Sequence, residues 1–220
     1  MQVRMKSRRR SACSRAMLVS VTFSVAAAFV GSPAFAAQPS GKETIVFLRH
    51  GEKPDAGLGQ LSCKGLNRSL ALPPVLTRTF GRPDAIFAPD PSRRKDDSGS
   101  LYDYIRPLAT IEPTAIAAGL PVDTTYGYDE IDKLQAALSA SRYQSSLVFV
   151  AWEHKQLYDL VGNLLRDNGG DPETMPKKWK GKDFDSLYVV TVDRTTPKPT
   201  ATFALKAEGL DQMADDCPVK

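Results

Sequence analysis

The chain has only two histidines, His50 and His154, and each of them follows a short apolar run. The run 44–48 leads into Arg49 and His50, and the run 146–151 leads toward His154. Apolar runs of this kind are typical of central strands that are covered on both faces. Because ligands bind beyond the carboxyl ends of the strands in open α/β sheets, we expect both imidazoles and the guanidinium to share one site.

The elements that carry these residues are expected to alternate between strands and helices. Ser62 is a suitable N-cap for a helix that buries Leu66 and Leu70 and is interrupted at Pro73-Pro74. Apolar residues at helical spacing predict a strong amphipathic helix before Asn168-Gly169-Gly170. In chain order, the other predicted elements are a strand over Asp84–Ala88, a helix through Leu108–Ala118, a helix through Ile131–Leu138, a strand over Ser146–Ala151 and the amphipathic helix through Leu157–Leu165.

The last part of the domain has a different pattern. Two strands are predicted over 187–192 and 200–205, with Pro197 and Pro199 in the turn between them. This pattern favours an antiparallel hairpin on the edge of an otherwise parallel sheet. The predicted fold class is therefore α/β: a three-layer αβα domain with a mostly parallel central sheet, helices on both faces and a C-terminal antiparallel edge hairpin.

The first 36 residues have the composition of a secretory signal peptide. A basic region without acidic residues precedes an apolar stretch over 16–31, and Ala34-Phe35-Ala36 supplies small residues before a cleavage point at Ala37. An uncleaved N-terminal anchor is the alternative. We predict a signal peptide over 1–36, one domain over 37–220, a periplasmic or secreted location, and no stable membrane anchor after signal removal.

Removal of the leader changes the charge balance of the chain. Six of the 29 Lys and Arg residues lie in the leader and none of the 25 Asp and Glu residues does, so the remaining chain carries a net charge of −2. We therefore expect no nucleic-acid partner. Cys63 and Cys217 remain, and the sequence leaves open whether they form a disulfide. With two distant histidines and no CxxC spacing, we expect neither a metal site nor a cofactor.

One polar segment is expected to lie at the surface, and a second is expected to shape the pocket with it. The segment Pro91–Ser100 is the most charged part of the chain, and its composition predicts a solvated surface loop. Together with Asp171–Lys182 it is expected to shape the pocket. Trp152 and Trp179 are expected to pack in the core or at the rim.

Four motifs resemble those of the histidine phosphatase superfamily, which has the phosphoglycerate-mutase-like fold. The segment 47–53 contains Arg-His-Gly and is similar to the family's RHG signature. The segment 61–68 is similar to L-[ST]-x-x-G-x-x-[QR], 106–115 looks like the region of the second arginine, and 148–154 looks like the strand of the second histidine. Their order matches that of the family across most of residues 43–206.

The resemblance implies a specific chemistry for four residues. Arg49 and Arg106 would hold the oxygens of a phosphomonoester through their planar forks. His50 would attack phosphorus as a neutral imidazole and become phosphohistidine. His154 would donate a hydrogen bond to the equatorial oxygens as charge spreads over them in the transition state. This scheme requires no metal.

The second arginine and the proton donor each have an alternative. Arg93 follows the second predicted strand more closely, but the residues after Arg106 match the family pattern, so Arg106 is preferred. Glu153 is preferred as the proton donor because it adjoins His154, and Glu130 is kept as the alternative.

Two further charged residues lie within the motifs. Glu52 is expected to anchor the loop after the first strand, and Arg68 is expected to be a surface charge on a helix.

The predicted location then narrows the function. An exported member of this family should transfer the phosphoryl group to water, which makes it a phosphatase acting on a small phosphorylated substrate. A binder of phosphorylated ligands without turnover, and a phosphotransferase or mutase of the same fold, are the alternatives. The sequence identifies neither the substrate nor the oligomeric state.

Overall fold

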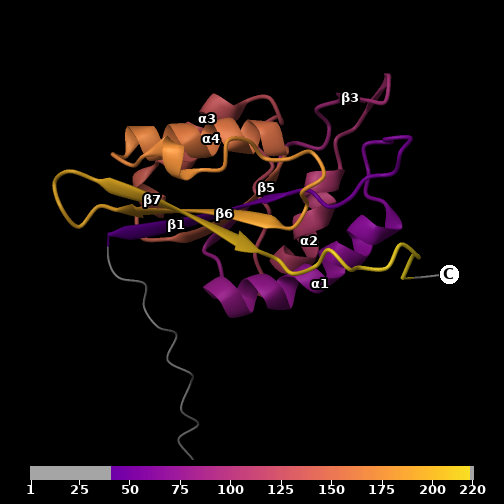
Figure 1. Ribbon diagram of the computed structural model, residues 1–220, viewed down its shortest axis with the longest axis horizontal. Coiled ribbons are helices and arrows are strands. Elements are labelled where there is room, and N and C mark those ends of the chain that lie inside the picture. The colour runs from indigo at the N-terminus through magenta and orange to yellow at the C-terminus, as the bar shows by residue number, and fades with distance from the viewer. Residues whose placement is uncertain (1–40, 219–220) are drawn as a thin grey trace, which may run out of the picture. The chain divides into compact units, whose positions relative to one another are not determined.

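The computed structural model describes residues 41–218, which form a five-stranded sheet with helices on both faces (Figure 1). The strands of this sheet are β1 (Lys42–Arg49), β2 (Ala85–Phe87), β5 (Leu147–Trp152), β6 (Ser186–Asp193) and β7 (Thr200–Ala207). The main helices are α1 (Cys63–Phe80), α2 (Arg106–Ala118), α3 (Ile131–Leu138) and α4 (His154–Asp167). Short 3₁₀ turns cover Ser141–Tyr143 and Pro172–Thr174.

The strand order is β2-β5-β1-β6-β7. The strands β2, β5 and β1 run parallel, whereas β6 pairs antiparallel with β1 and β7 pairs antiparallel with β6. The α/β class, the three layers and the C-terminal edge hairpin predicted from the sequence are therefore confirmed. Antiparallel pairing is not confined to the β6–β7 hairpin, because β6 also pairs antiparallel with β1.

Two apolar cores lie on the two faces of the sheet. Figure 1 shows α3 and α4 covering one face and α1 and α2 covering the other. Strand β1 contributes Phe47 to the first core and Leu48 to the second, because successive side chains of a strand point to opposite faces. Burial on both faces explains why residues 45–48 of β1 are all apolar. Trp152 and Trp179 belong to the first core, as their expected packing role requires.

Helix α1 corrects two predictions. It continues through Pro73 and Pro74 instead of being interrupted there, since Leu72 and Leu76 on either side of the prolines are fully buried in the second core. The predicted buried face was also wrong, because Leu70 is 52% exposed. The residues that α1 buries are Gly65, Arg68, Ser69, Leu72 and Leu76.

Arg68 was expected at the surface, but its side chain is fully buried. Its guanidinium binds four carboxylates that come from distant parts of the sequence. We call these five residues the Arg68 cluster; they are Arg68, Glu52, Asp185, Glu208 and Asp211. The cluster joins the loop after β1 to helix α1 and to the segments on either side of the β6–β7 hairpin.

The segment Pro91–Ser100 is more ordered than its composition predicted. It contains β3 (Lys95–Asp97), which pairs antiparallel with β4 (Ser100–Tyr102) in a separate two-stranded sheet. The prediction of a solvated loop was wrong for Asp97, whose side chain is buried. The hairpin turn consists of Ser98 and Gly99, both with positive φ, as a two-residue turn that follows the strand twist requires.

Cys63 and Cys217 form a disulfide, with their Cα atoms 4.5 Å apart. The bond holds the C-terminal tail against the start of α1. The predicted signal peptide over 1–36 lies outside the described residues. Among residues 41–218, none of the helices combines the length and the apolar composition that crossing a membrane requires.

Candidate active site

The carboxyl ends of β1 and β5 bring the predicted site residues together. The two strands are parallel, and Arg49 is paired with Trp152 in their register. The backbone N–H of His50 then donates to the carbonyl of Trp152 over 3.1 Å. Glu153 and His154 follow directly, so both predicted histidines lie just beyond adjacent strand ends. The expectation that these strand ends form one edge of the sheet is confirmed.

Arg106 also lies near the carboxyl ends of β1 and β5, and it comes from α2, which covers the face of the sheet opposite α4. It is the first residue of α2 and is 3% exposed. Thr110, one turn further along α2, accepts a hydrogen bond from the backbone N–H of Gly51 and donates to the carbonyl of Arg106. The backbone N–H of Arg106 donates to Gly59. These hydrogen bonds hold the start of helix α2 against the loop that follows β1 and begins with His50.

His50 is held as a neutral imidazole with a defined tautomer. Burial lowers the pKa of His50 well below its usual range, and the positive charges of Arg49 and Arg106 lower it further. Its Nδ1 lies 2.8 Å from the carbonyl oxygen of Gly51. A carbonyl oxygen can only accept, so Nδ1 must carry the proton and Nε2 must carry the lone pair. Nε2 is therefore the atom that can act as a nucleophile.

Arg49 is oriented by the segment that precedes β6. Its NH1 donates to the carbonyl of Gly181 over 2.7 Å and to that of Asp183 over 3.2 Å. Its guanidinium carbon lies 3.8 Å from the centre of the Phe184 ring. Burial lowers the pKa of Arg49 to about 10, which leaves it charged at neutral pH. Its Nε is buried without a hydrogen-bond partner among the described residues. Part of the segment Asp171–Lys182 thus reaches the site, as expected.

Tyr104 lies between His50 and Arg106 and is also buried. Its ring centre is 6.1 Å from that of His50, and the guanidinium carbon of Arg106 is 5.0 Å from it. Within the described residues, neither the Tyr104 hydroxyl nor Arg106 Nε has a hydrogen-bond partner. Since buried polar groups are costly when unpaired, three unpaired donors around one imidazole favour a site for an oxyanion.

Asp97 holds Arg106 in place. Its carboxylate accepts from Arg106 NH1 over 2.6 Å and also binds Lys53. Burial alone would raise the pKa of Asp97, but the hydrogen bonds from Lys53 and Arg106 outweigh it and lower the pKa. Asp97 is thus an ionised carboxylate that fixes the guanidinium of Arg106.

Glu153 is the N-cap of α4 and contacts His154. Its Oε2 accepts from the backbone N–H groups of Lys155 and Gln156. Its Oε1 lies 2.8 Å from Nδ1 of His154, although the two groups are not aligned as a hydrogen bond. Burial favours the neutral acid, but His154 and the two backbone donors outweigh it and lower the pKa of Glu153 to about 2. Glu153 is therefore a carboxylate in the free site.

The alternative residues lie elsewhere. Arg93 is exposed and pairs with Asp129 over 3.0 Å, so it is not grouped with Arg49. Glu130 binds the backbone N–H of Gly127 and Lys133. By contrast, Glu153 is near enough to His50 and Arg49 to influence the pKa of each. The geometry thus favours Arg106 over Arg93 and Glu153 over Glu130.

Glu52 and two glycines support the loop that follows β1. Glu52 binds Arg68 through both carboxylate oxygens, which agrees with its predicted role as an anchor. A Cβ on Gly65 would lie 2.3 Å from the carbonyl oxygen of Glu52, and one on Gly51 would lie 3.1 Å from Gly65. The loop after His50 can therefore pack against α1 only because both positions lack a side chain.

Sequence reasoning did not identify Tyr104, Asp97 or Lys53 as part of the site. The turn signal Ser98-Gly99 between short segments could have indicated the β3–β4 hairpin. No local signal distinguishes Tyr104 from an ordinary core tyrosine.

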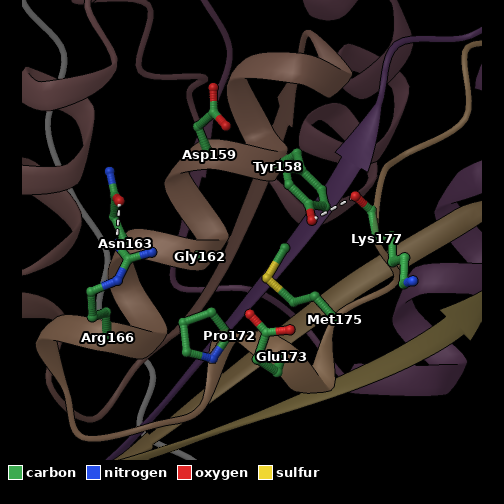
Figure 2. A pocket seen from close by; sticks show the side chains of 9 residues that line it. All are labelled: Tyr158, Asp159, Gly162, Asn163, Arg166, Pro172, Glu173, Met175 and Lys177. Atoms are coloured by element: carbon green, nitrogen blue, oxygen red, sulfur yellow. Dashed lines mark hydrogen bonds between the residues drawn. The ribbon is translucent and has the colours of Figure 1, made fainter.

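A separate groove with a volume of about 400 Å³ lies along α4. Figure 2 shows Tyr158 and Met175 on the same side of this groove, with the Tyr158 hydroxyl donating to the carbonyl of Lys177. None of the predicted site residues lines it. The residues that line it are Tyr158, Asp159, Gly162, Asn163, Arg166, Pro172, Glu173, Met175 and Lys177.

Comparison with solved structures identifies the fold. A mycobacterial glucosyl-3-phosphoglycerate phosphatase has a TM-score of 0.52 with 14% sequence identity, covering 74% of this chain and 97% of its own. A protein of Escherichia coli K-12, whose proposed activity is that of an alpha-ribazole-5'-P phosphatase, has a TM-score of 0.51 with 13% identity, covering 81% of this chain and 99% of its own.

The chain has the fold of the histidine phosphatase superfamily. The expected phosphoglycerate-mutase-like architecture is therefore confirmed. No protein-family model matches the sequence, and no curated protein does. At such identities the similarity concerns the histidine phosphatase fold alone, and the chemistry has to be argued from the side chains described above.

Proposed function

We propose that the protein hydrolyses phosphomonoesters through a phosphohistidine intermediate on His50, without a metal ion or cofactor. The observation that carries this proposal is the set of three buried, unpaired donors on Arg49, Arg106 and Tyr104 around a neutral imidazole. A phosphate group presents several oxygens that accept hydrogen bonds and a negative charge that two guanidinium groups offset.

In the first step, the lone pair on Nε2 of His50 attacks phosphorus and forms the P–N bond. The bond from phosphorus to the ester oxygen breaks at the same time, and its electron pair leaves with the alcohol. Arg49 and Arg106 stabilise the charge that spreads over the equatorial oxygens. Arg106 and His154 are also the first residues of α2 and α4, so the positive ends of two helix dipoles face this charge.

Glu153 is assigned as the group that exchanges the proton. Its pKa of about 2 in the free site makes it a carboxylate, whereas protonation of the leaving oxygen requires the acid form. A bound phosphate dianion raises the pKa of a neighbouring carboxyl group, since like charges disfavour ionisation. In the second step the carboxylate takes a proton from water, which attacks phosphorus and releases phosphate and neutral His50.

The disulfide, the predicted signal peptide and a related structure support a phosphatase that acts outside the cytoplasm. The Cys63–Cys217 disulfide is expected where thiols are not kept reduced, such as the periplasm or the exterior. The predicted signal peptide over 1–36 agrees with such a location. A mycobacterial phosphatase of this fold, 15% identical with a TM-score of 0.50, was solved with inorganic phosphate. We therefore propose water rather than a second metabolite as the acceptor, and small phosphorylated molecules as substrates.

The proposal is tested with a panel of phosphomonoesters on residues 37–220, in the presence of a chelator. We expect phosphate release that the chelator does not abolish and that His50→Ala removes. His50→Ala should be compared with the wild type in thermal unfolding, so that loss of activity is separated from loss of fold. Chelator-sensitive release, or release that persists in a folded His50→Ala protein, would contradict the proposal.

A second candidate is a binder of phosphorylated ligands that does not turn over. The fact that both Glu153 and Glu130 are held as carboxylates, with each pKa below its usual range, favours this alternative. Calorimetric titration with phosphate separates the two candidates. Tight binding of phosphate together with no release from any ester of the panel would support the binder.

The proton donor is tested by comparing Glu153→Gln with Glu130→Gln on esters whose alcohols differ in pKa. Only loss of the true donor should penalise poor leaving groups more than good ones. We expect this selective penalty in Glu153→Gln and an even, small effect in Glu130→Gln. The opposite result would move the assignment to Glu130.

A further inference from the structure

The β3–β4 hairpin presents two charged side chains toward the active site and two away from it. Side chains alternate along a strand, so Lys95 and Asp97 share one face of β3 while Asp96 lies on the other; Arg94 directly precedes the strand. Asp97 is buried and Lys95 is half-buried, whereas Arg94 and Asp96 are exposed. The charged segment therefore has an inner and an outer face.

Asp97 fixes the inner face of the hairpin against the site. It binds Arg106 and Lys53, and it also accepts from the backbone N–H of Gly59. A Cβ on Gly57 would lie 2.5 Å from the Asp97 carboxyl carbon, so the loop after β1 packs closely on the hairpin. The position of Lys95, two residues before Asp97, is thereby set relative to Arg106.

The ammonium group of Lys95 lies among aromatic rings that border the site. Its Nζ is 4.1 Å from the ring centre of Tyr128 and 5.6 Å from that of Tyr104. Tyr104 in turn contacts both His50 and Arg106. In the part of the chain that the structure describes, no carboxylate lies within salt-bridge distance of Lys95.

The charged groups that act on Lys95 do so from beyond salt-bridge distance. Burial lowers its pKa, the like charges of Arg106 and Lys155 lower it further, and Glu153 and Asp129 oppose these effects. A lysine that served only to hold the hairpin would gain from a counterion, as Lys53 does with Asp97. Among the described residues, Lys95 instead lies against two aromatic rings and has no carboxylate within salt-bridge distance, so an additional anion of the ligand would pair with it.

We propose that Lys95 is a substrate-binding residue that takes a second anionic group, so that the substrate is a phosphomonoester whose alcohol carries a carboxylate or another anion. This inference rests on the proposed phosphatase function. The phosphoryl group occupies the site of Arg49, Arg106 and His50, and the second anion lies toward the hairpin. Lys155, on the first turn of α4, adds to the positive potential on that side.

The test uses phenyl phosphate and the meta and para isomers of carboxyphenyl phosphate. The readout is the ratio of kcat/KM for each carboxylated ester to that for phenyl phosphate. Loss of a charge-assisted hydrogen bond should lower the ratio in Lys95→Gln roughly ten- to hundredfold for at least one isomer. Lys95→Arg, which keeps the charge, should retain most of the ratio. Arg94→Gln is the matched control, because Arg94 is the neighbouring cation and its side chain is exposed.

The inference is overturned if Lys95→Gln lowers all three kcat/KM values by the same factor, because that result indicates a role in packing the hairpin. An unchanged ratio in Lys95→Gln overturns it as well. If the wild type hydrolyses none of the esters, the proposed function fails instead. In that case calorimetry gives the dissociation constant of each ester, and the affinity for each carboxylated ester is divided by that for phenyl phosphate. Equal affinity ratios in the wild type and Lys95→Gln would contradict the proposed second-anion site.

Discussion

Two buried arginine sites in this protein differ in how completely their guanidinium groups are paired. Arg68 directs Nε, NH1 and NH2 at carboxylates, with distances from 2.7 to 3.2 Å. Arg49 and Arg106 each use NH1 for protein partners, and each leaves a buried Nε unpaired. All three guanidinium groups are buried, so burial alone does not distinguish them.

The difference separates an arginine that holds the fold from arginines that are available to a ligand. Four carboxylates around Arg68 exceed its single charge, so the Arg68 cluster has no capacity for another anion. At the active site the cations exceed what Asp97 and Glu153 neutralise. The unpaired donors, rather than the number of arginines, are therefore the basis for the proposed phosphate site.

The largest expected effect is on turnover. Arg49→Met should lower kcat/KM for phosphomonoesters by about a thousandfold or more, because one guanidinium then no longer stabilises transition-state charge. His154→Ala should also lower turnover by orders of magnitude. Steady-state kinetics and thermal unfolding are measured on the same preparations. Near-normal activity in either variant would remove that residue from the site.

Arg68→Met should produce the reverse pattern, with its main effect on stability. The substitution removes the cation that Glu52, Asp185 and Asp211 surround, and removing one partner of a buried ion pair costs about 3–5 kcal/mol. Denaturant unfolding gives the change in the free energy of unfolding. Arg106→Met is the matched variant: it should cost less stability, since Lys53 still pairs with Asp97, and more activity. Equal losses of stability in both variants would contradict the distinction between Arg68, which stabilises the fold, and Arg106, which is available to a ligand.

The double variant Cys63→Ser, Cys217→Ser should lower the free energy of unfolding by about 2–5 kcal/mol, because the disulfide restricts the unfolded chain. The bond joins the start of α1 to the tail, and neither Cys63 nor Cys217 is adjacent in sequence to a proposed site residue, so kcat should change little at a temperature where the variant is folded. Wild-type protein in reductant should behave like the variant. A large fall in kcat without unfolding would show that the disulfide positions the site.

Glu208→Gln should change how stability depends on pH. Burial raises the pKa of Glu208 to about 8, and Asp185 and Glu52 add to this effect against the attraction of Arg68. The folded protein then holds a proton that the unfolded chain has lost, so stability falls as pH rises from the usual glutamate range toward pH 8. Glu208→Gln should reduce this fall. Chemical unfolding at several pH values measures it, and identical pH dependence in the two proteins would show that Glu208 is ionised throughout.

Arg93→Gln should have the smallest effect. Arg93 is exposed and pairs with the exposed Asp129, and solvent screens this pair, so stability should hardly change. Its kcat/KM should stay near the wild-type value, unlike that of Arg106→Met. A loss comparable to that of Arg106→Met would restore Arg93 as the second arginine.

The sequence predicted the grouping of those candidate site residues whose position follows from strand order. His50 and His154 lie just beyond the ends of adjacent parallel strands, and the apolar runs of β1 and β5 predict both strands. Arg106 could be chosen over Arg93 from the residues that follow it. These features are local or follow from simple rules of α/β topology.

The residues that sequence reasoning misplaced depend on partners far away in the chain. Arg68 resembles a surface charge until Glu208 and Asp211 fold back onto α1. Asp97 belongs to a run of charges whose composition predicts a solvated loop, and only its contact with Arg106 and Lys53 shows why it is buried. Composition indicates the average environment of a segment, whereas the pairing of each charge is decided by tertiary structure.

The proposal that His50 is the nucleophile is tested most directly by trapping the phosphoenzyme. The wild type and Glu153→Gln are mixed with a phosphomonoester and quenched in alkali, which preserves phosphohistidine, and the digested peptides are analysed by mass spectrometry. In the wild type we predict one added phosphoryl group on the peptide that contains His50. Glu153→Gln should accumulate more of this phosphopeptide, because hydrolysis of the intermediate is slowed. His50→Ala should contain no phosphopeptide. Phosphoryl label on another residue, or phosphate release by a folded His50→Ala protein, would contradict the account.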